Sequence, residues 1–333
     1  MGAVDTRGHQ VTSHRIAVVV PSYKVTRHIL GVLAAIGPEV DAIYCVDDAC
    51  PEQSGRFIEA NSTDPRVRVL YNAVNQGVGG ATMAGYRQAV LDGMSVIVKI
   101  DGDGQMDPAL LPMFVAPILN GDADYTKGNR FWDLSHIARM PLLRRAGNLG
   151  LSFLAKASTG YWRLFDPTNG YTAIHAAVAD RLPMNAISTR YFFETDVLFR
   201  LNAMQAVVVD VPMDALYGDE VSNLKVRQIF GEFALKHARN FLKRIGYRYY
   251  LRDLTIASFE LVAALILLSG GIAYGGWNWI LAASAGVSAP IGTVVLPSIA
   301  IVSGLQFLLA FLSYDISNQP VRPVHDSLAR LRR

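Results

Sequence analysis

Three side chains with oxygen donors occur at alternate positions after an apolar run, a spacing that could build a metal site. Asp101, Asp103 and Gln105 follow residues 96–100, which are typical of a buried strand, and the intervening glycines and Pro108 mark a tight turn. Both carboxylates of such a turn can face one point, and Mg²⁺ or Mn²⁺ binds oxygen ligands of this kind together with phosphate oxygens. The stretch predicts a metal site beside a phosphate, although a solvated acidic turn between a strand and a helix would carry the same residues.

Polar or glycine-rich turns also follow three earlier apolar runs, at residues 16–20, 42–46 and 67–71. These runs alternate with helical patterns, which indicates an α/β sheet. Ligands of open α/β sheets lie beyond the carboxyl ends of the strands, so turns at those ends should line one crevice. Each turn alone could be a helix cap or a tight turn, but together they predict a nucleotide site with a metal beside its phosphates. The residues predicted to bind the nucleotide are Pro21, Tyr23, Asp47, Asp48, Asn75, Gly79 and Asp101.

Downstream of the acidic turn the sequence continues the same α/β pattern. A further strand-like run leads to Arg130, and residues 166–170 carry a strong turn signal. Glu194 and Asp196 lie near the expected start of a helix, where acidic side chains are favoured, and residues 207–212 close the sheet.

The composition places part of the chain in lipid, since 51% of the residues are hydrophobic and 18% charged, an unusual balance for a soluble enzyme. Residues 254–274 and 291–312 are almost wholly apolar, and at ~1.5 Å per residue each can cross a hydrocarbon core of ~30 Å. No lysine or arginine lies between them and basic residues crowd both outer flanks, so both termini are expected in the cytoplasm. The basic amphipathic segment before them suits either an anionic membrane surface or packing on the globular domain.

The same composition argues against other classes of protein. A formal net charge of +3 without a basic and aromatic stripe gives no reason to expect a nucleic-acid partner. Cys45 and Cys50 lack CxxC spacing and are expected to be reduced thiols of a cytosolic compartment. The first 15 residues are polar and show no secretory signal.

In this order the motifs resemble the family 2 glycosyltransferases of GT-A fold, specifically the polyprenyl-phosphate glycosyltransferases similar to dolichol-phosphate mannose synthase. The resemblance covers residues 16–224 by motif, and the two apolar segments match those of membrane-anchored bacterial members. It implies an α/β GT-A domain with a Rossmann-like mixed sheet, then an amphipathic helix and two transmembrane helices, in a bacterial inner or plasma membrane. The expected organisation is a polar tail at 1–14, the catalytic domain at 15–222, juxtamembrane helices at 223–253, the spans at 254–313 and a basic cytoplasmic tail at 314–333.

The resemblance also implies roles for individual residues. Asp101, Asp103 and Gln105 would hold Mg²⁺ or Mn²⁺ against the donor diphosphate. The acceptor phosphate needs cations, and arginine offers a planar fork suited to phosphate oxygens. The residues expected at that phosphate are Arg130, Arg144, Arg145, Thr168 and Asn169, and those expected to be catalytic are Asp103, Arg130, Glu194 and Asp196.

Two segments depart from the family pattern. Lys24 and Val25 stand where the family often has Asn-Glu, a glutamate that helps to read the base in relatives using GDP-mannose, so a UDP-sugar donor is favoured. The late basic-serine motif of the family is altered at residues 217–224, which leaves the acceptor contacts there open.

The expected reaction is inverting transfer of a hexose from a nucleotide-diphosphate sugar to a polyprenyl phosphate at the cytoplasmic membrane face, giving a lipid-linked sugar for cell-surface polysaccharide synthesis. A phosphate monoester is largely ionised at neutral pH, with its second pKa near ~6, so it needs no general base. One alternative is a membrane glycosyltransferase that extends a saccharide, for which Glu194 or Asp196 would have to act as the base. Another is a non-catalytic membrane scaffold. Related membrane members can form homo-oligomers, but no self-complementary surface is evident in the sequence.

Overall fold

The computed structural model describes residues 14–132, 142–214 and 226–331, with the side chains of residues 142–146, 148 and 226–230 left out of the description. The chain forms two compact units, whose boundary falls within helix α9 (Val226–Gly246). The first comprises the residues up to Asn240 together with Pro320–Arg333, and the second is Phe241–Gln319.

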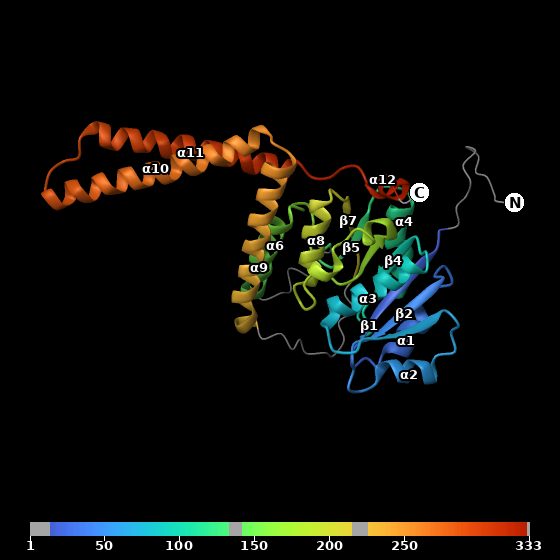
Figure 1. The fold of residues 1–333 in the computed structure, drawn as a ribbon. Coiled ribbons are helices and arrows are strands. Elements are labelled where there is room, and N and C mark those ends of the chain that lie inside the picture. Colours follow the sequence, from blue (N-terminus) through green and yellow to red (C-terminus); the bar gives the residue numbers. More distant parts are fainter. Residues whose placement is uncertain (1–13, 133–141, 215–225, 332–333) are drawn as a thin grey trace. The chain divides into compact units, whose positions relative to one another are not determined.

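The first unit is built on a mixed sheet that has seven strands in the described residues, in the order β3-β2-β1-β4-β6-β5-β7 (Figure 1). Only β6 among them is antiparallel to its neighbours β4 and β5, so the other strands end at a common edge. The α/β class and the mixed sheet are thereby confirmed, whereas the short β6 was not predicted from the sequence. The bounds are β1 Ile16–Ser22, β2 Ala42–Asp47, β3 Val67–Tyr71, β4 Val96–Lys99, β5 Tyr125–Asn129, β6 Thr172–His175 and β7 Val208–Pro212.

Helices cover both faces of this sheet, and alternate side chains of β1 show why. Ala17 and Val19 belong to a core under α3, α7 and α8, while Val18 and Val20 belong to a second core under α1, α2 and α4. A strand buried on both faces reads as an unbroken apolar run, which is how this one appeared in the sequence. The helices are α1 Ile29–Ala35, α2 Ser54–Asn61, α3 Gly77–Leu91, α4 Leu111–Leu119, α6 Leu142–Thr159, α7 Ala176–Ala179 and α8 Phe193–Ala203, with 3₁₀ turns at Pro108–Leu110 and Met184–Ala186.

The C-terminal residues return to the first unit. The backbone N–H groups of Val324 and His325, and the Nδ1 of His325, bond the fully buried carboxylate of Asp124 at 2.8–3.0 Å. Helix α12 (His325–Arg330) follows and packs near α7. Within the segment expected to be a basic tail, residues 325–330 form this helix, whose start is held by the hydrogen bonds from Val324 and His325 to Asp124.

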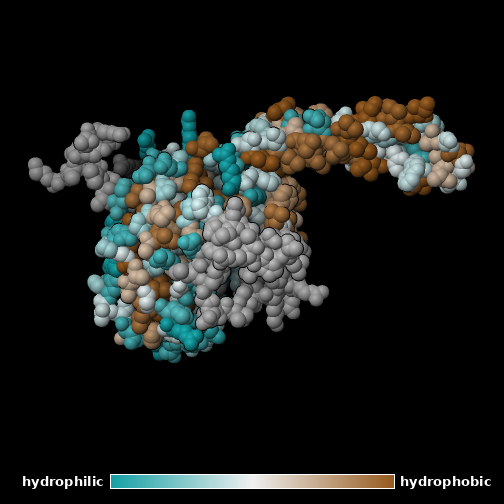
Figure 2. Space-filling model, turned by 180° about the vertical axis from the view of Figure 1, so that it is seen from behind, coloured by the Kyte–Doolittle hydropathy of each residue, from teal (hydrophilic) through white to brown (hydrophobic). Residues whose placement is uncertain are grey.

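The second unit contains two long apolar helices, α10 (Ile256–Ala285) and α11 (Ile291–Ser317), which run side by side (Figure 1). Both are long and apolar enough to cross a membrane. Hydrophobic side chains cover much of the pair's visible surface (Figure 2). The helices approach closely where a Cβ on Gly275 would lie 2.9 Å from Pro297 and one on Gly304 would lie 2.8 Å from Leu268. Small residues of this kind are what close helix packing in lipid requires.

Polar side chains join the ends of this helix pair to the segment before it. The Arg244 guanidinium bonds both carboxylate oxygens of Asp315 at 2.6 and 2.9 Å, and the Tyr249 hydroxyl donates to the same carboxylate at 2.6 Å. Tyr249 lies in a π-helical turn, Tyr247–Arg252, that precedes α10. The three side chains are buried, and the contacts described join them to one another within this unit.

Candidate active site

A cavity of about 420 Å³ opens beyond the carboxyl ends of β1, β2, β3 and β4, where the sequence predicted the nucleotide site. Six of the predicted residues line it, from four separate strand ends. They are Pro21, Tyr23, Asp48, Asn75, Asp101 and Asp103. The carboxyl ends of the strands therefore place residues that lie up to 82 positions apart in the sequence in one cavity, as the position of ligands in α/β sheets predicts.

Asp48 fixes one wall of this cavity. Its carboxylate, 2% exposed, accepts hydrogen bonds from the backbone N–H of Gln76 at 2.9 Å, from that of Gly77 at 2.6 Å and from Asn72 Nδ2 at 2.7 Å. Asn75 donates in turn to the carbonyl of Asp48. Hydrogen bonds to an ionised acceptor are stronger than neutral ones, so Asp48 holds the glycine-rich turn against the end of β2.

Two predicted nucleotide ligands have structural positions instead. The carboxylate of Asp47 points into the protein, where it accepts from the backbone N–H groups of Cys50 at 2.7 Å and Gly55 at 2.6 Å. Gly79 donates its N–H to the Thr189 carbonyl, and a Cβ on it would lie 2.7 Å from the Ser188 carbonyl. Neither residue lines the cavity. Asp47 stabilises the turn into α2, and Gly79 permits the close approach of residues 188–189.

That close approach places at the cavity two residues that were not predicted from the sequence to bind the nucleotide. Arg190 and Tyr191 line it together with Lys24 and Tyr23. A Cβ on Gly77, whose φ is +80°, would lie 2.7 Å from the Thr189 carbonyl and 3.0 Å from Arg190 Cγ. The glycine-rich turn was the only signal for this contact, and it did not identify the partner.

The acidic turn lies at the floor of the cavity. The Asp103 carboxylate accepts from the backbone N–H of Gln105 at 3.0 Å, and Gly104 adopts φ +79°, which glycine alone adopts without strain. Asp101 makes an ion pair of 2.7 Å with Lys99, which is 1% exposed. Asp101 and Glu194 raise the pKa of Lys99 against the opposing effect of burial.

The donor set suits a hard divalent cation that is shared with a phosphate. Among the described residues, no three His, Cys, Asp or Glu side chains gather closely enough to hold a metal by themselves. Asp101 and Asp103 supply two carboxylates facing the cavity, and the amide of Gln105 lies in the same turn. Such a partial set fits Mg²⁺ or Mn²⁺ when phosphate oxygens complete the shell.

The two carboxylates considered as a general base do not line the cavity. Glu194, in the first turn of α8, is half-buried, with Oε1 3.9 Å from Lys99 Nζ; burial raises its pKa, while Lys99 and Lys127 act to lower it. Asp196 accepts from the Ser188 N–H at 2.8 Å and from Asn240 Nδ2 at 3.2 Å. Neither carboxylate lines the cavity, and the base role stays a prediction that belongs to the alternative with a saccharide acceptor.

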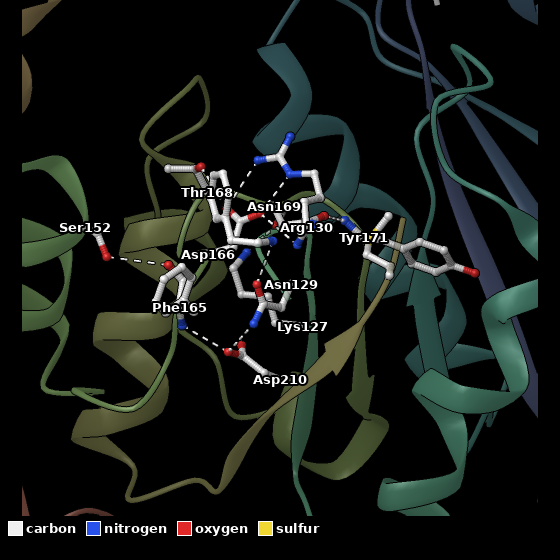
Figure 3. Close-up of polar contacts among 12 residues, drawn as sticks. Lys127, Asn129, Arg130, Ser152, Phe165, Asp166, Thr168, Asn169, Tyr171 and Asp210 are labelled. Atoms are coloured by element: carbon white, nitrogen blue, oxygen red, sulfur yellow. Dashed lines mark hydrogen bonds and ion pairs between the residues drawn. The ribbon is translucent and has the colours of Figure 1, made fainter. Parts of the chain in front are cut away.

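A polar cluster surrounds the turn at residues 165–169, in the region where acceptor contacts were predicted (Figure 3). Arg130 forms a bidentate ion pair with the fully buried Asp166, with Nε and Nη2 at 2.7 and 3.2 Å from the two carboxylate oxygens. Thr168 donates to the same carboxylate at 3.2 Å and is exposed. Arg130 and Thr168 therefore lie next to each other, because both donate to the Asp166 carboxylate beneath them.

Asn169 faces inward, contrary to its predicted role. Its side-chain oxygen accepts from the Tyr171 N–H at 2.9 Å, its amide contacts the sulfur of Met213, and its carbonyl accepts from Lys127 Nζ. Burial, opposed by Glu194 and Asp166, lowers the pKa of Lys127 to about 8. Asn169 thus shapes the turn.

Asp210 of β7 joins the same cluster from the other side. It accepts from the Phe165 N–H at 2.9 Å and from Asn129 Nδ2 at 3.4 Å (Figure 3). Burial raises its pKa to about 6. The side chains of Arg144 and Arg145, at the start of α6, and all of residues 217–224 lie outside the described part, so their predicted contacts stay predictions.

Comparison with known proteins agrees with this architecture. The profile of glycosyl transferase family 2 matches residues 17–182. An undecaprenyl-phosphate mannosyltransferase of Micrococcus luteus is 30% identical over 204 residues, which cover 60% of this chain and 82% of that protein. A UDP-N-acetylglucosamine–dolichyl-phosphate N-acetylglucosaminyltransferase of Methanococcus voltae is 24% identical over 255 residues, 72% of this chain and 95% of that one.

A solved structure agrees in fold. Glucosyl-3-phosphoglycerate synthase of Mycobacterium tuberculosis, crystallised with Mn²⁺, UDP and phosphoglyceric acid, superimposes with a TM-score of 0.51 at 18% identity and covers 70% of this chain and 79% of that one. The likeness at this identity concerns the GT-A fold. The sequence matches show that the chain belongs to glycosyl transferase family 2.

Proposed function

We propose that this glycosyltransferase moves a hexose from a nucleotide-diphosphate sugar to a polyprenyl phosphate at the cytoplasmic face of a membrane, with inversion at the anomeric carbon. The observation that carries the proposal is the pair Asp101 and Asp103 facing a cavity at the sheet edge, in a chain that also carries two helices apolar enough to span a membrane. Relatives named for transfer to undecaprenyl and dolichyl phosphates support the choice of acceptor.

The cavity offers complementary groups for a nucleotide diphosphate. Tyr23 and Tyr191, 44% and 56% exposed, present aromatic faces on which a base can stack. Lys24 and Arg190 supply cations for phosphate oxygens. A Mg²⁺ or Mn²⁺ ion held by Asp101, Asp103 and Gln105 would supply Lewis-acid stabilisation of the charge that develops on the leaving diphosphate.

The positions of the other carboxylates support a phosphate acceptor over a sugar hydroxyl. A hydroxyl nucleophile requires a base within hydrogen-bond reach, whereas an ionised phosphate monoester does not. Glu194 is half-buried, Asp196 is buried, and neither lines the cavity. Arg130 and Thr168 offer donors at the surface, although two donors of Arg130 are already directed at Asp166.

A UDP-sugar is the favoured donor. Lys24 and Val25 line the cavity in place of the Asn-Glu pair associated with GDP-mannose, and neither side chain offers the carboxylate acceptor that a guanine amino group needs. The Methanococcus relative named for a UDP-sugar is consistent with this choice, and the relatives named as mannosyltransferases make GDP-mannose the competing donor to test.

The test uses the purified full-length chain in detergent with Mn²⁺, a short polyprenyl phosphate and radiolabelled UDP- and GDP-sugars. We expect a lipid-extractable labelled product that is lost in Asp103→Asn. Asp107→Asn is the matched control, because Asp107 belongs to the same turn but caps a 3₁₀ turn and does not line the cavity. Donor binding without lipid product, with product on an added saccharide instead, would refute the acceptor.

A further inference from the structure

Lys99 is a buried cation that the proposed reaction does not use directly. It is the last residue of β4, is 1% exposed, and its ammonium lies 2.7 Å from Asp101 Oδ1 and 3.9 Å from Glu194 Oε1. Lysine is almost never fully buried unless it is paired, and an unpaired buried ammonium is costly. The residue therefore stays charged against these two acids, one of which faces the cavity.

The turn at residues 166–170 packs directly against this pair. A Cβ on Gly170 would lie 2.6 Å from Lys99 Nζ and 2.8 Å from Asp101 Oδ2, so the turn at residues 166–170 closes directly over both groups. Glu194 faces the same ammonium from α8. Lys99 thus holds a fixed positive charge against one oxygen of the carboxylate that is expected to bind a metal.

Lys99 offsets part of the negative charge at the acidic turn. In the described part of the chain the charged side chains lining the cavity are Lys24, Asp48, Asp101, Asp103 and Arg190, three acids and two bases. Behind Asp101, Lys99 adds a positive charge at 2.7 Å, and Glu194 adds a negative one on the far side of that ammonium, at 3.9 Å. Lys99, the nearer of the two to Asp101, therefore weakens the attraction of this carboxylate for a divalent cation alone, whereas a nucleotide diphosphate brings several negative charges of its own.

We propose that Lys99 is a positioning residue that makes metal binding depend on the nucleotide. Its ammonium occupies one oxygen of Asp101 and offsets that charge, so the acidic turn holds Mn²⁺ or Mg²⁺ weakly by itself and tightly with a nucleotide diphosphate. The ion then enters with the donor and leaves with the nucleotide product. This inference rests on the proposed function, because it requires a nucleotide diphosphate in the cavity.

The test is a titration of Mn²⁺ followed by electron paramagnetic resonance on the full-length chain in detergent, with and without UDP or GDP. For the unaltered chain we expect weak binding of Mn²⁺ alone and much tighter binding with the nucleotide. In Lys99→Met, we expect the affinity for Mn²⁺ alone to rise about tenfold or more, because a charge within ~4–6 Å changes the proton affinity of a carboxylate by about one to three orders of magnitude.

Two further variants separate charge from packing. Lys99→Gln keeps a donor for Asp101 but removes the charge, so it should raise the affinity for Mn²⁺ alone as Lys99→Met does. Lys127→Met is the matched control, since Lys127 is equally buried but donates to the Asn169 carbonyl; it should leave this affinity within about twofold. Melting temperatures identify any variant that fails to fold.

The outcomes distinguish the two proposals. Tight binding of Mn²⁺ alone by the unaltered chain would overturn the role of Lys99, as would unchanged affinity in folded Lys99→Met or Lys99→Gln. Failure of the unaltered chain to bind any nucleotide with Mn²⁺ would instead count against the proposed function.

Discussion

Asp48→Asn removes one negative charge from the wall of the cavity and leaves the shape of the side chain almost unchanged. The structure assigns three hydrogen bonds to this carboxylate, from the N–H groups of Gln76 and Gly77 and from Asn72 Nδ2. An asparagine oxygen in the Oδ1 position keeps the bonds from Gln76 and Asn72. Its NH₂ group then faces the Gly77 N–H, so one charge-assisted bond becomes a contact between two donors.

The expected cost follows from that exchange. A hydrogen bond to a charged group contributes about 1.5–3 kcal/mol, and the abandoned N–H of Gly77 stays beside a buried side chain. For a domain of this size, each kcal/mol lowers the melting temperature by about 2–4 °C, so Asp48→Asn should lower it by about 3–12 °C. Because the glycine-rich turn forms one wall of the cavity, affinity for the nucleotide should fall with it.

Asp47→Asn is the informative comparison for this experiment. Asp47 also holds two backbone N–H groups, those of Cys50 and Gly55, but it does not line the cavity. It should lower the melting temperature to a similar degree and leave nucleotide affinity, measured by calorimetry in detergent, nearly unchanged. If Asp48→Asn abolished nucleotide binding at an unaltered melting temperature, Asp48 would be a direct ligand, and its role in holding the turn would be refuted.

Three further substitutions test the packing, the pH response and the helix pair. Gly85→Ala would place a Cβ 2.3 Å from Val19 Cγ1 where α3 meets β1, so we expect about 1–3 kcal/mol of destabilisation in a thermal melt; an unchanged melt would contradict this close packing. Burial lowers the pKa of His175 from 6.5 to about 4, so between these pH values the unfolded chain binds a proton on this side chain that the folded chain does not. The free energy of unfolding should therefore fall by about 3 kcal/mol as the pH falls from 6.5 to 4. His175→Asn should flatten that part of the pH profile of the melting temperature, and an equally steep profile would exclude this origin. Asp315→Ala removes the carboxylate that the buried Arg244 contacts and should cost about 3–5 kcal/mol, visible as earlier proteolysis of the second unit, whereas a paired change of both residues to apolar side chains should recover much of the loss.

The sequence predicted the part of the fold that follows from continuous apolar runs and strand-end turns. Strands such as β1 and β4 are buried on both faces, so their residues read as uninterrupted apolar segments, and the turns after them met at one cavity. The short strand β6 was not predicted, because four residues after a turn show too little periodicity to indicate a strand. The two apolar helices were expected, but both extend beyond the predicted bounds, to Ala285 and Ser317.

The candidate site was harder to predict at the level of single side chains. Spacing shows that Asp47 and Asp48 share a turn, but it cannot show that one carboxylate faces the protein and the other the cavity. Contacts between distant segments could not be predicted from the sequence either. Arg190, for example, lines the cavity because it packs on Gly77. Lys99 did leave a signal, a single lysine within an apolar run, which indicates a buried ion pair when an acid follows two residues later.

The position of Glu194, and not its pKa, argues against a role as a base. Burial raises its pKa even though Lys99 and Lys127 act to lower it, but its carboxylate faces Lys99 Nζ at 3.9 Å and does not line the cavity. The pairing of Lys99 with Asp101 and Glu194 keeps one cation beneath the carboxyl end of β4, where anionic phosphates are expected to gather. Because Glu194 is paired with a buried lysine, the site suits a nucleophile that is already ionised. The lipid phosphate proposed as the acceptor is such a nucleophile.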